Sequence, residues 1–346
     1  MSKEVAVVIL NWNGIGHLKE FLPSVVKNTS DELAEIVVVD NASTDESVAY
    51  LKTAYPRITT IINPQNGGFA KGYNDGLKFV EAKYYVLLNS DVEVTPGWIE
   101  PLYHKMESSS RIAACQPKVL DYKNKVCFEH AGAAGGYIDQ FGYPFCRGRL
   151  FHHIEEDSGQ YNDDVEIFWA TGACMMLKAE LFHKLGGFDE TFFAHMEEID
   201  LCWRLKNRGY QIHYVHQAKV FHLGGGTLSV ISPNKTYLNF RNNLYLLYKN
   251  LPDQFLFKTI FARMLLDGLA FFHFVLGGKL KHAQAIWRAH IHFYRNLKSL
   301  KASRADNKQY LQIKYLSGVY KGALVWQCYI KSKKIFSQLD LKSFEK

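Results

Sequence analysis

The first ninety residues alternate short apolar runs with amphipathic stretches, and this alternation constrains the fold more than any other feature. The apolar runs occupy residues 5–10, 36–40, 58–63 and 84–89. Each stretch between them has the composition of a helix. Four strands with three intervening helices predict right-handed βαβ crossovers and a parallel, doubly wound α/β sheet.

Polar side chains stand at the ends of three of these predicted strands. Asn11 and Asp40 end the first two strands, and Asn89 and Asp91 end the fourth. Ligands of open parallel sheets bind beyond the carboxyl ends of the strands, where the strand order reverses. With the order 3-2-1-4, these side chains would converge on one crevice. An Asp after a single strand can equally be a turn or helix cap, as with the capping box predicted for Ser43 and Glu46.

The first strand does not lead into a glycine loop of the dinucleotide-binding type. Gly14 and Gly16 are present, but Lys19 occupies the place of the third glycine in G-x-G-x-x-G, and the sequence has no P-loop. A divalent cation is another means of holding phosphates. Because Mg²⁺ and Mn²⁺ prefer oxygen ligands, Asp91 could bridge such a cation to a pyrophosphate, beside the neutral Asn89.

A second cluster of carboxylates begins a helix predicted within residues 192–210. On a helical wheel Glu198 falls inside the apolar arc, whereas Asp200 and Arg204 form an i,i+4 pair on the polar face and Glu197 lies between. A carboxylate on the buried side of a first turn is costly without a task, so Glu198 is the candidate general base. Alternatively, Glu198 satisfies free backbone N–H groups at the helix start.

A short strand at 218–222 ends in His222 and is followed by three glycines, 224–226. The imidazole could complete a metal site with Asp91, and the glycines would let a loop close over phosphates. A purely structural role for His222 is equally open.

Six motifs, taken in order, resemble the family 2 glycosyltransferases, and most closely the rhamnosyltransferase-like enzymes of bacterial surface-polysaccharide assembly. The motifs are "VVILNWNG", "VVVDNASTD", "NGGFAKGYNDG", "LLNSDVEV", "TGACMMLKAELFHKLGGFDETFFAHMEEIDLCWRLKNRGY" and "VFHLGGGTL", within roughly residues 3–250. The resemblance implies a GT-A fold with a Rossmann-like nucleotide-binding sheet. It also implies a nucleotide-sugar donor held with Mg²⁺ or Mn²⁺, and inversion at the anomeric carbon by direct displacement.

The resemblance assigns roles residue by residue. Asn11 and Asp40 match positions that hold the nucleotide, Asp40 at the base or ribose, and Asn66 and Asn74 match positions that line the same site. Asn89 to Asp91 match the family's DxD position, where Asp91 would carry the metal, and His222 matches a position at the metal or pyrophosphate. Glu197 and Glu198 match the family's Glu-Asp pair, whose second member is the base. Trp169 and Gly172 match positions near the donor sugar and acceptor.

The same resemblance and the change of pattern along the chain predict its divisions. The middle of the chain has α+β character, and from about residue 233 the pattern is helical and rich in Lys and Arg. The expected parts are a catalytic domain (1–232), with a nucleotide-binding half (1–110) and an acceptor half (111–232), and a helical C-terminal region (233–346).

The apolar segment 255–278 is interrupted by Lys258, Arg263 and Asp267, and the uncharged run after Asp267 is eleven residues, too short for a membrane span. With the basic segment that follows, it predicts an interfacial amphipathic helix pair. The alternative is a helical subdomain packed on the catalytic core or on a second subunit. Arg241, early in this region, could reach the donor pyrophosphate or lie on a helix surface.

These observations predict an enzyme that moves a sugar from dTDP-rhamnose or a UDP-sugar to a hydroxyl of a lipid-linked glycan acceptor. The N-terminal apolar run is too short for a signal peptide, so we expect a cytoplasmic protein, peripheral at the inner face of the membrane. The alternative is a catalytically silent nucleotide-sugar-binding scaffold on the membrane. Nucleic-acid binding is disfavoured, since no such module is present, and an oligomer remains open. The six cysteines, without CxxC pairs, are expected to be reduced core thiols.

Overall fold

The computed structural model describes residues 3–224, 232–311 and 316–345. Its first four strands form the predicted parallel unit, and their order 3-2-1-4 confirms the prediction. Asn11 lies opposite Asp40, and Leu10 lies opposite Asn89, so the polar strand ends share one edge of the sheet. The strands are β1 (Val5–Asn11), β2 (Ala34–Asp40), β3 (Thr59–Ile62) and β4 (Tyr84–Asn89).

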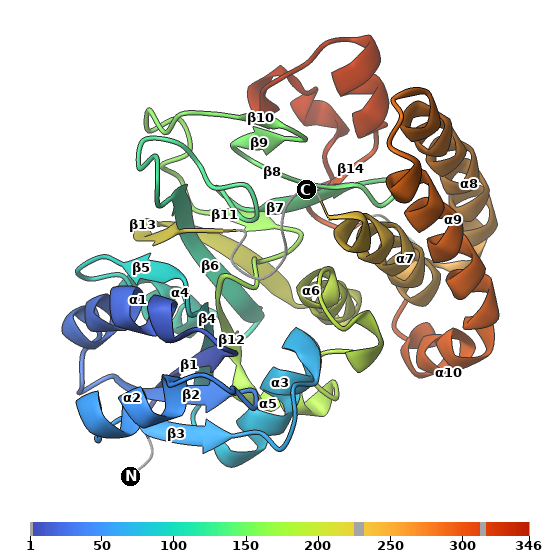
Figure 1. The fold of residues 1–346 in the computed structure, drawn as a ribbon. Helices are drawn as coiled ribbons and strands as arrows, with labels where there is room; N and C mark the ends of the chain where they lie inside the picture. Colours follow the sequence, from blue (N-terminus) through green and yellow to red (C-terminus); the bar gives the residue numbers. More distant parts are fainter. Residues whose placement is uncertain (1–2, 225–231, 312–315, 346) are drawn as a thin grey trace.

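The crossover helices cover both faces of this unit (Figure 1). Alternate residues of a strand point to opposite faces, so Val7 packs in the cluster that contains Leu18, and Val8 packs in the cluster that contains Tyr73. Burial on both faces explains why the strands read as continuous apolar runs rather than alternating ones. The helices are α1 (Ile15–Asn28), α2 (Ser47–Ala54) and α3 (Gly68–Gly76).

The predicted acceptor half extends the same sheet. Beyond β4 the order continues β12, β6, β13 and β11, and the short β5 pairs with β13. One curved sheet therefore joins the two predicted halves. The added elements are β5 (Val92–Val94), α4 (Glu100–Glu107), β6 (Ile112–Asp121), β11 (Val165–Ile167), β12 (Cys174–Lys178), α5 (Ala179–Lys184), α6 (Glu197–Asn207) and β13 (Gln211–His222).

A smaller five-stranded sheet packs above it, with the order β10-β9-β8-β7-β14. Its last strand comes from the C-terminal segment, where the rings of Phe336 and Phe344 lie 5.1 and 5.4 Å from that of Tyr137. The end of the chain therefore differs from the predicted helical region, because its aromatic residues bury themselves against this sheet. The strands are β7 (Gly136–Asp139), β8 (Pro144–Cys146), β9 (Arg149–Leu150), β10 (His153–Ile154) and β14 (Val319–Tyr320).

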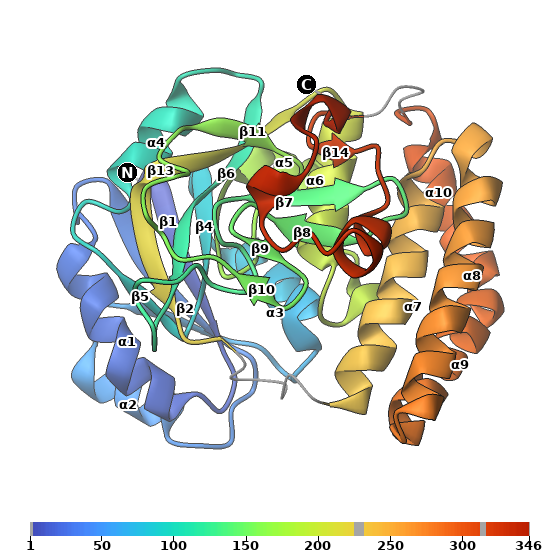
Figure 2. The ribbon, with the colours of Figure 1, turned by 90° about the horizontal axis from the view of Figure 1, so that it is seen from above.

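Four helices occupy one end of the molecule, and Figure 2 shows α7, α8 and α9 running side by side. They are α7 (Pro233–Asn250), α8 (Asp253–Leu276), α9 (Leu280–Arg295) and α10 (Leu297–Lys308). By length and composition alone, α8 meets the criteria for a membrane span, which core helices of soluble proteins also meet, in contrast to the prediction from its uncharged run of eleven residues. All six cysteines are free thiols and four are buried.

Candidate active site

Asn11 and Asp40 form a buried hydrogen-bonded cluster at the ends of β1 and β2. Asn11 Nδ2 donates to Asp40 Oδ2 at 2.9 Å, and Ser43 donates its hydroxyl to the same oxygen at 2.7 Å and its backbone N–H to Oδ1 at 2.8 Å. The predicted capping role of Ser43 is therefore wrong, since α2 begins at Ser47 and Ser43 closes the β2 loop instead. Asp40 has no exposed surface here, so its carboxylate orders this loop.

One oxygen of this hydrogen-bonded cluster, the amide oxygen of Asn11, has no hydrogen-bond partner. Asn11 Oδ1 is buried and makes no hydrogen bond. A Cβ at Gly14 would lie 2.4 Å from this oxygen and 3.7 Å from Ser90 Oγ, so only glycine lets the loop pass between the ends of β1 and β4. Buried polar atoms are normally paired, so this oxygen is an unusual unpaired acceptor at the ends of β1 and β4.

Asn66 and Asn74 lie in different surroundings. Asn66 Oδ1 accepts hydrogen bonds from Asn41 Nδ2 and from the N–H of Gly68, both at 2.9 Å, beside the end of β2. Asn74 instead pairs with the backbone of Phe188, donating at 2.8 Å and accepting at 2.9 Å. Asn66 therefore belongs to the strand-end loops, whereas Asn74 attaches α3 to the chain that leads to α6.

Asp91, His222 and Glu129 form a buried row at the far side of the strand ends. His222 Nε2 lies 3.2 Å from Asp91 Oδ1, and His222 Nδ1 lies 3.4 Å from Glu129 Oε1. Burial lowers the pKa of His222, but the two facing carboxylates outweigh burial and raise it to about 10. Burial raises the pKa of Asp91, but the hydrogen bond and charge of His222 outweigh it and lower the pKa.

Sequence reasoning missed Glu129. The pairing of β6 with β13 and of β13 with β5 brings it to His222, which lies opposite Val92 and Asp121. No spacing in the sequence links Glu129 to the other two residues, so only the non-local pairing could reveal it.

The residues at the strand ends fit a divalent cation in part. Asp91 offers a carboxylate at the end of β4, with Asn89 and Ser90 beside it as neutral oxygen groups. His222 faces Asp91 with one ring nitrogen and Glu129 with the other, so it holds the Asp91 carboxylate in place, and its role as a metal ligand stays a prediction. Among the residues that the structure describes, no three His, Cys, Asp or Glu side chains form a complete metal site. Nucleotide phosphates and water would therefore supply most ligands, as Mg²⁺ and Mn²⁺ sites allow. The glycines 225 and 226, predicted to close over phosphates, lie outside the described residues.

Glu197 and Glu198 begin α6, and each leaves one buried carboxylate oxygen without a partner. Burial raises the pKa of Glu198 to about 7, and backbone N–H groups of the first turn oppose only part of this effect. Burial and the neighbouring Glu198 also raise the pKa of Glu197 well above its ordinary value. A partly exposed carboxylate with a pKa near 7 suits a general base at neutral pH.

The predicted i,i+4 pair of Asp200 and Arg204 on the polar face of α6 is confirmed, but this face is buried. Both are buried, and Asp200 accepts hydrogen bonds from Arg204 Nε at 2.8 Å, Lys249 Nζ at 2.9 Å and Asn250 Nδ2 at 2.8 Å. Burial raises the pKa of Asp200, but Lys249 and Arg204 outweigh it and lower the pKa to about 2. Helix α7 covers this face, which a helical wheel cannot show.

The loop 191–196 that leads into α6 has an unusual backbone. Phe193, His195 and Met196 have positive φ values of 64°, 69° and 77°, which side chains other than glycine adopt at a cost. Asn242 of α7 holds this backbone, since its Nδ2 donates to the carbonyl oxygens of Phe192 at 3.1 Å, Ala194 at 2.9 Å and His195 at 2.7 Å. The loop fixes where α6 starts and hence where Glu198 points.

Arg241 acts on the same loop. Its NH2 group donates to the carbonyl oxygens of Thr191 at 3.1 Å and Phe192 at 3.0 Å, and its guanidinium lies 5.2 Å from the ring centres of Tyr237 and Tyr245. In this conformation Arg241 supports the loop 191–196, and its reach to the donor pyrophosphate stays a prediction.

We predict that Asn242→Ala lowers both stability and turnover. The carbonyl oxygens of Ala194 and His195 lose this donor, whereas that of Phe192 keeps Arg241, and the loss should cost about 1–3 kcal/mol of unfolding free energy in chemical denaturation. Because Asn242 positions the loop before Glu198, kcat should fall while KM for the donor changes little. Asn234→Ala, on the exposed first turn of α7, is the matched control. An unchanged kcat in a destabilised Asn242 variant would show that the residue is only structural.

Gly172 and Trp169, both predicted to lie near the donor sugar and acceptor, have different surroundings in the structure. A Cβ at Gly172 would lie 3.2 Å from Phe69 Cζ and 3.9 Å from Glu198 Cβ, and the N–H of Asn89 donates to Ala173 O at 3.0 Å. Gly172 therefore links the end of β4 to the start of α6. The Trp169 side chain is buried, and its indole N–H donates to Tyr137 O at 2.8 Å, so it serves the core.

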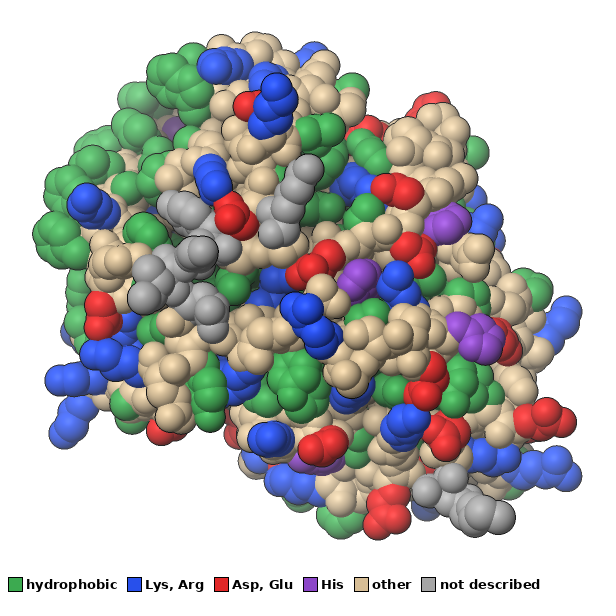
Figure 3. All heavy atoms as spheres, turned by 180° about the vertical axis from the view of Figure 1, so that it is seen from behind, with side chains coloured by type: hydrophobic (Ala, Val, Ile, Leu, Met, Phe, Trp, Pro, Cys, Tyr) green, Lys and Arg blue, Asp and Glu red, His purple; other side chains and the backbone are tan. Residues whose placement is uncertain are grey.

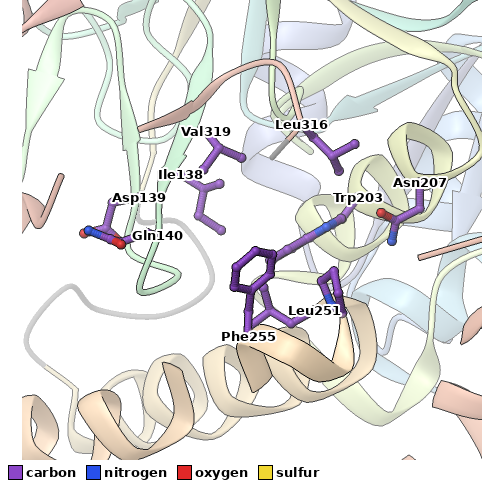
Figure 4. Close-up of a pocket in the computed structure, with 10 residues that line it drawn as sticks. Ile138, Asp139, Gln140, Trp203, Asn207, Leu251, Phe255, Leu316 and Val319 are labelled. Atoms are coloured by element: carbon purple, nitrogen blue, oxygen red, sulfur yellow. The ribbon is translucent and has the colours of Figure 1, made fainter. Parts of the chain in front are cut away.

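A small pocket lies on the other side of α6, between Trp203 and Asn207 of that helix and the end of β7 (Figure 4). Its one carboxylate, Asp139, accepts hydrogen bonds from the backbone N–H groups of Phe141, Tyr143 and Leu324. The Asp139 carboxylate thus stabilises the backbone around it, and none of the predicted site residues lines this pocket.

Comparison with known proteins identifies the family and the fold of this chain. The sequence pattern described as glycosyl transferase family 2 matches residues 6–186. The N-acetylglucosaminyl-diphospho-decaprenol L-rhamnosyltransferase of Mycobacterium tuberculosis is 24% identical over 237 residues, 64% of this chain and 76% of that protein. The rhamnosyltransferase WbbL of Escherichia coli K12 is 26% identical over 227 residues, 63% of this chain and 83% of that protein.

Two solved structures show the same fold at low sequence identity. GalNAc-T7, solved with UDP, GalNAc and Mn²⁺, has a TM-score of 0.56 at 18% identity, over 73% of this chain and 49% of that one. The mannosyltransferase PcManGT of Pyrobaculum calidifontis, in complex with GDP-Man and Mn²⁺, has a TM-score of 0.51 at 16% identity, over 90% and 82%. With its GT-A fold and its rhamnosyltransferase relatives, the chain belongs to glycosyl transferase family 2.

Proposed function

We propose that this glycosyltransferase moves one sugar from a nucleoside-diphosphate donor to an acceptor hydroxyl with inversion at the anomeric carbon. The observation that carries the proposal is the position of Glu198, which lies on the other side of Gly172 from the strand end with Asn89 and Asp91. The pKa of this carboxyl is raised to about 7. A single carboxylate base facing a phosphate site suits one direct displacement.

In this reaction Glu198 accepts the proton of the acceptor hydroxyl while the hydroxyl oxygen forms a bond to the anomeric carbon. The bond from that carbon to the phosphate oxygen breaks, and its electron pair leaves with the nucleoside diphosphate. Asp91, with Asn89 beside it, would hold a divalent cation, Mg²⁺ or Mn²⁺, which supplies charge neutralisation for the leaving group. The side chain of His222 orients Asp91, and the loop 191–196 orients Glu198.

The relatives guide the choice of donor and acceptor. Two of them are rhamnosyltransferases, and one is named for a diphospho-decaprenol carrier. We therefore propose dTDP-rhamnose as the donor, with UDP-sugars as the alternative, and a glycan on a lipid carrier as the acceptor. Such an acceptor places the enzyme at the cytoplasmic face of a membrane.

A thermal-shift panel with UDP, dTDP, GDP and CDP, each with and without Mn²⁺ or Mg²⁺, tests the donor site. A nucleotide at about one hundred times its Kd should add about 2.7 kcal/mol of stability. We expect a metal-dependent shift with dTDP or UDP. The absence of a shift with all four nucleotides would contradict the proposal.

A further inference from the structure

Helix α8 turns one row of apolar side chains outward and two charged side chains, Arg263 and Asp267, inward. Arg263 and Asp267 are 2% and 0% exposed. The outward residues recur at intervals of three and four, so they form one stripe along the whole helix. This stripe, called the α8 stripe below, consists of Phe257, Phe261, Met264, Leu265, Leu269, Phe272 and Leu276, which are between 43% and 88% exposed.

The inward charges fix this orientation. Arg263 donates to Asp267 Oδ1 at 2.9 Å and lies 4.0 Å over the ring of Tyr143, and His290 of α9 lies 3.1 Å from Asp267 Oδ2. Rotating α8 to bury the stripe would expose these partners or leave buried charges unpaired, which is strongly destabilising. The outward apolar stripe is therefore built into the fold.

The apolar surface continues onto α9. Leu280, Trp287 and Tyr294 follow one another at intervals of seven residues and are 64%, 63% and 44% exposed. Figure 3 shows hydrophobic side chains gathered along the edge of the molecule that α8 forms, at the left in this view. Single exposed apolar residues are ordinary, but a contiguous surface of this kind marks an interaction site.

The charges around the stripe identify what covers it. Between residues 254 and 305 the single acidic residue is Asp267, which is buried. The exposed charges of this segment are Lys258, Lys279, Lys281, Arg288, Arg295, Lys298 and Lys301. Two copies of this surface in a symmetric contact would set basic groups against basic groups, whereas an anionic lipid surface complements them.

We propose that the α8 stripe lies in the interface of an anionic bilayer, with α8 parallel to the membrane plane and the basic groups on lipid phosphates. Helix α8 packs lengthwise on α9, and Arg263 attaches it to the small sheet's loop through Tyr143, so it does not cross the bilayer in this arrangement. The inference deepens the proposed function and rests on it, since a membrane-seated enzyme would meet a lipid-linked acceptor.

Flotation of the purified full chain with vesicles tests this proposal. We expect binding to vesicles of phosphatidylcholine mixed with phosphatidylglycerol and much weaker binding to phosphatidylcholine alone. Raising the ionic strength from about 0.1 M to about 1 M, which shortens the Debye length from about 10 to about 3 Å, should release part of the protein. The double variant Leu265→Glu, Leu269→Glu should bind at least about tenfold more weakly, because it places charge in the apolar interface.

Phe79→Glu, at a residue that is 75% exposed on the nucleotide-binding half, is the matched control and should bind like the wild type. Equal vesicle binding by the Leu265/Leu269 variant and the wild type would overturn the proposal. So would a wild-type dimer in solution that this variant converts to a monomer, because a second copy would then cover the stripe. The nucleotide thermal shift without vesicles separates the two claims, since it should persist in the Leu265/Leu269 variant even if membrane docking is wrong.

Discussion

Replacing Glu198 by Gln is expected to lower kcat by about 10²–10⁴-fold, because the amide cannot accept the proton of the acceptor hydroxyl. Nucleotide binding should persist, since Glu198 lies across Gly172 from the phosphate site. Initial rates of nucleoside diphosphate release, with acceptor present, measure the effect. Glu190→Gln, an exposed carboxylate just before the loop 191–196, is the control. A Glu198→Gln enzyme with normal turnover would remove the residue from the mechanism.

The same variant should also change the pH dependence. Burial raises the pKa of Glu198 to about 7, so the wild-type rate should rise as pH increases through this value and the base loses its proton. The folded state holds the Glu198 proton more tightly than the unfolded state does, so protonation of Glu198 stabilises the folded state. This contribution to stability is complete at acidic pH and is lost as pH rises through about 7. Glu198→Gln should therefore raise the melting temperature relative to the wild type at pH 8. A carboxylate with only a structural role would give the opposite change.

Asp91→Asn should remove the metal-dependent part of donor affinity and lower the transfer rate by about 10²–10⁴-fold, corresponding to several kcal/mol of charge stabilisation. Titration calorimetry of the nucleotide with and without Mn²⁺ measures the first effect. Glu93→Gln is a matched control only two residues away, because Glu93 pairs with Lys125 at 2.5 Å on the surface. Metal-dependent binding that survives in Asp91→Asn would place the cation elsewhere.

The parts of this fold that depend on local pattern were predictable from sequence. Continuous apolar runs separated by helical stretches predicted the parallel unit of β1 to β4, and its observed order 3-2-1-4 brings Asn11, Asp40 and Asn89 to one edge. The helical wheel placed Glu198 inside the apolar arc, whereas in the structure Glu197 and Asp200 are buried and Glu198 is partly exposed, so the role of Glu198 as base stays a prediction.

The features that depend on distant segments were not predictable. Glu129 reaches His222 only through the pairing of β6 with β13, and Asn242 reaches the loop 191–196 only because α7 packs on α6. The helical wheel gave the pair of Asp200 with Arg204, but not Lys249 of α7, which completes a buried network around Asp200. Ser43 matched a capping pattern, but the nearby Asp40 carboxylate is a stronger partner for its hydroxyl than the next helix start.

Helix α8 illustrates a different limit. Its composition indicated an amphipathic surface helix, but composition does not say which side faces the protein. The structure supplies that direction through Arg263 and Asp267, whose inward pairing leaves the apolar stripe exposed.

The anomeric configuration of the first product tests the central claim most directly. The wild-type enzyme is incubated with the donor selected by the nucleotide panel and an acceptor glycan, and the product is followed by NMR from the first minutes of reaction. One displacement assisted by the single base Glu198 predicts a glycosidic bond with the configuration opposite to that of the donor. Retention of the donor configuration would require a second covalent step and would contradict the assignment of Glu198 as the base of a direct displacement.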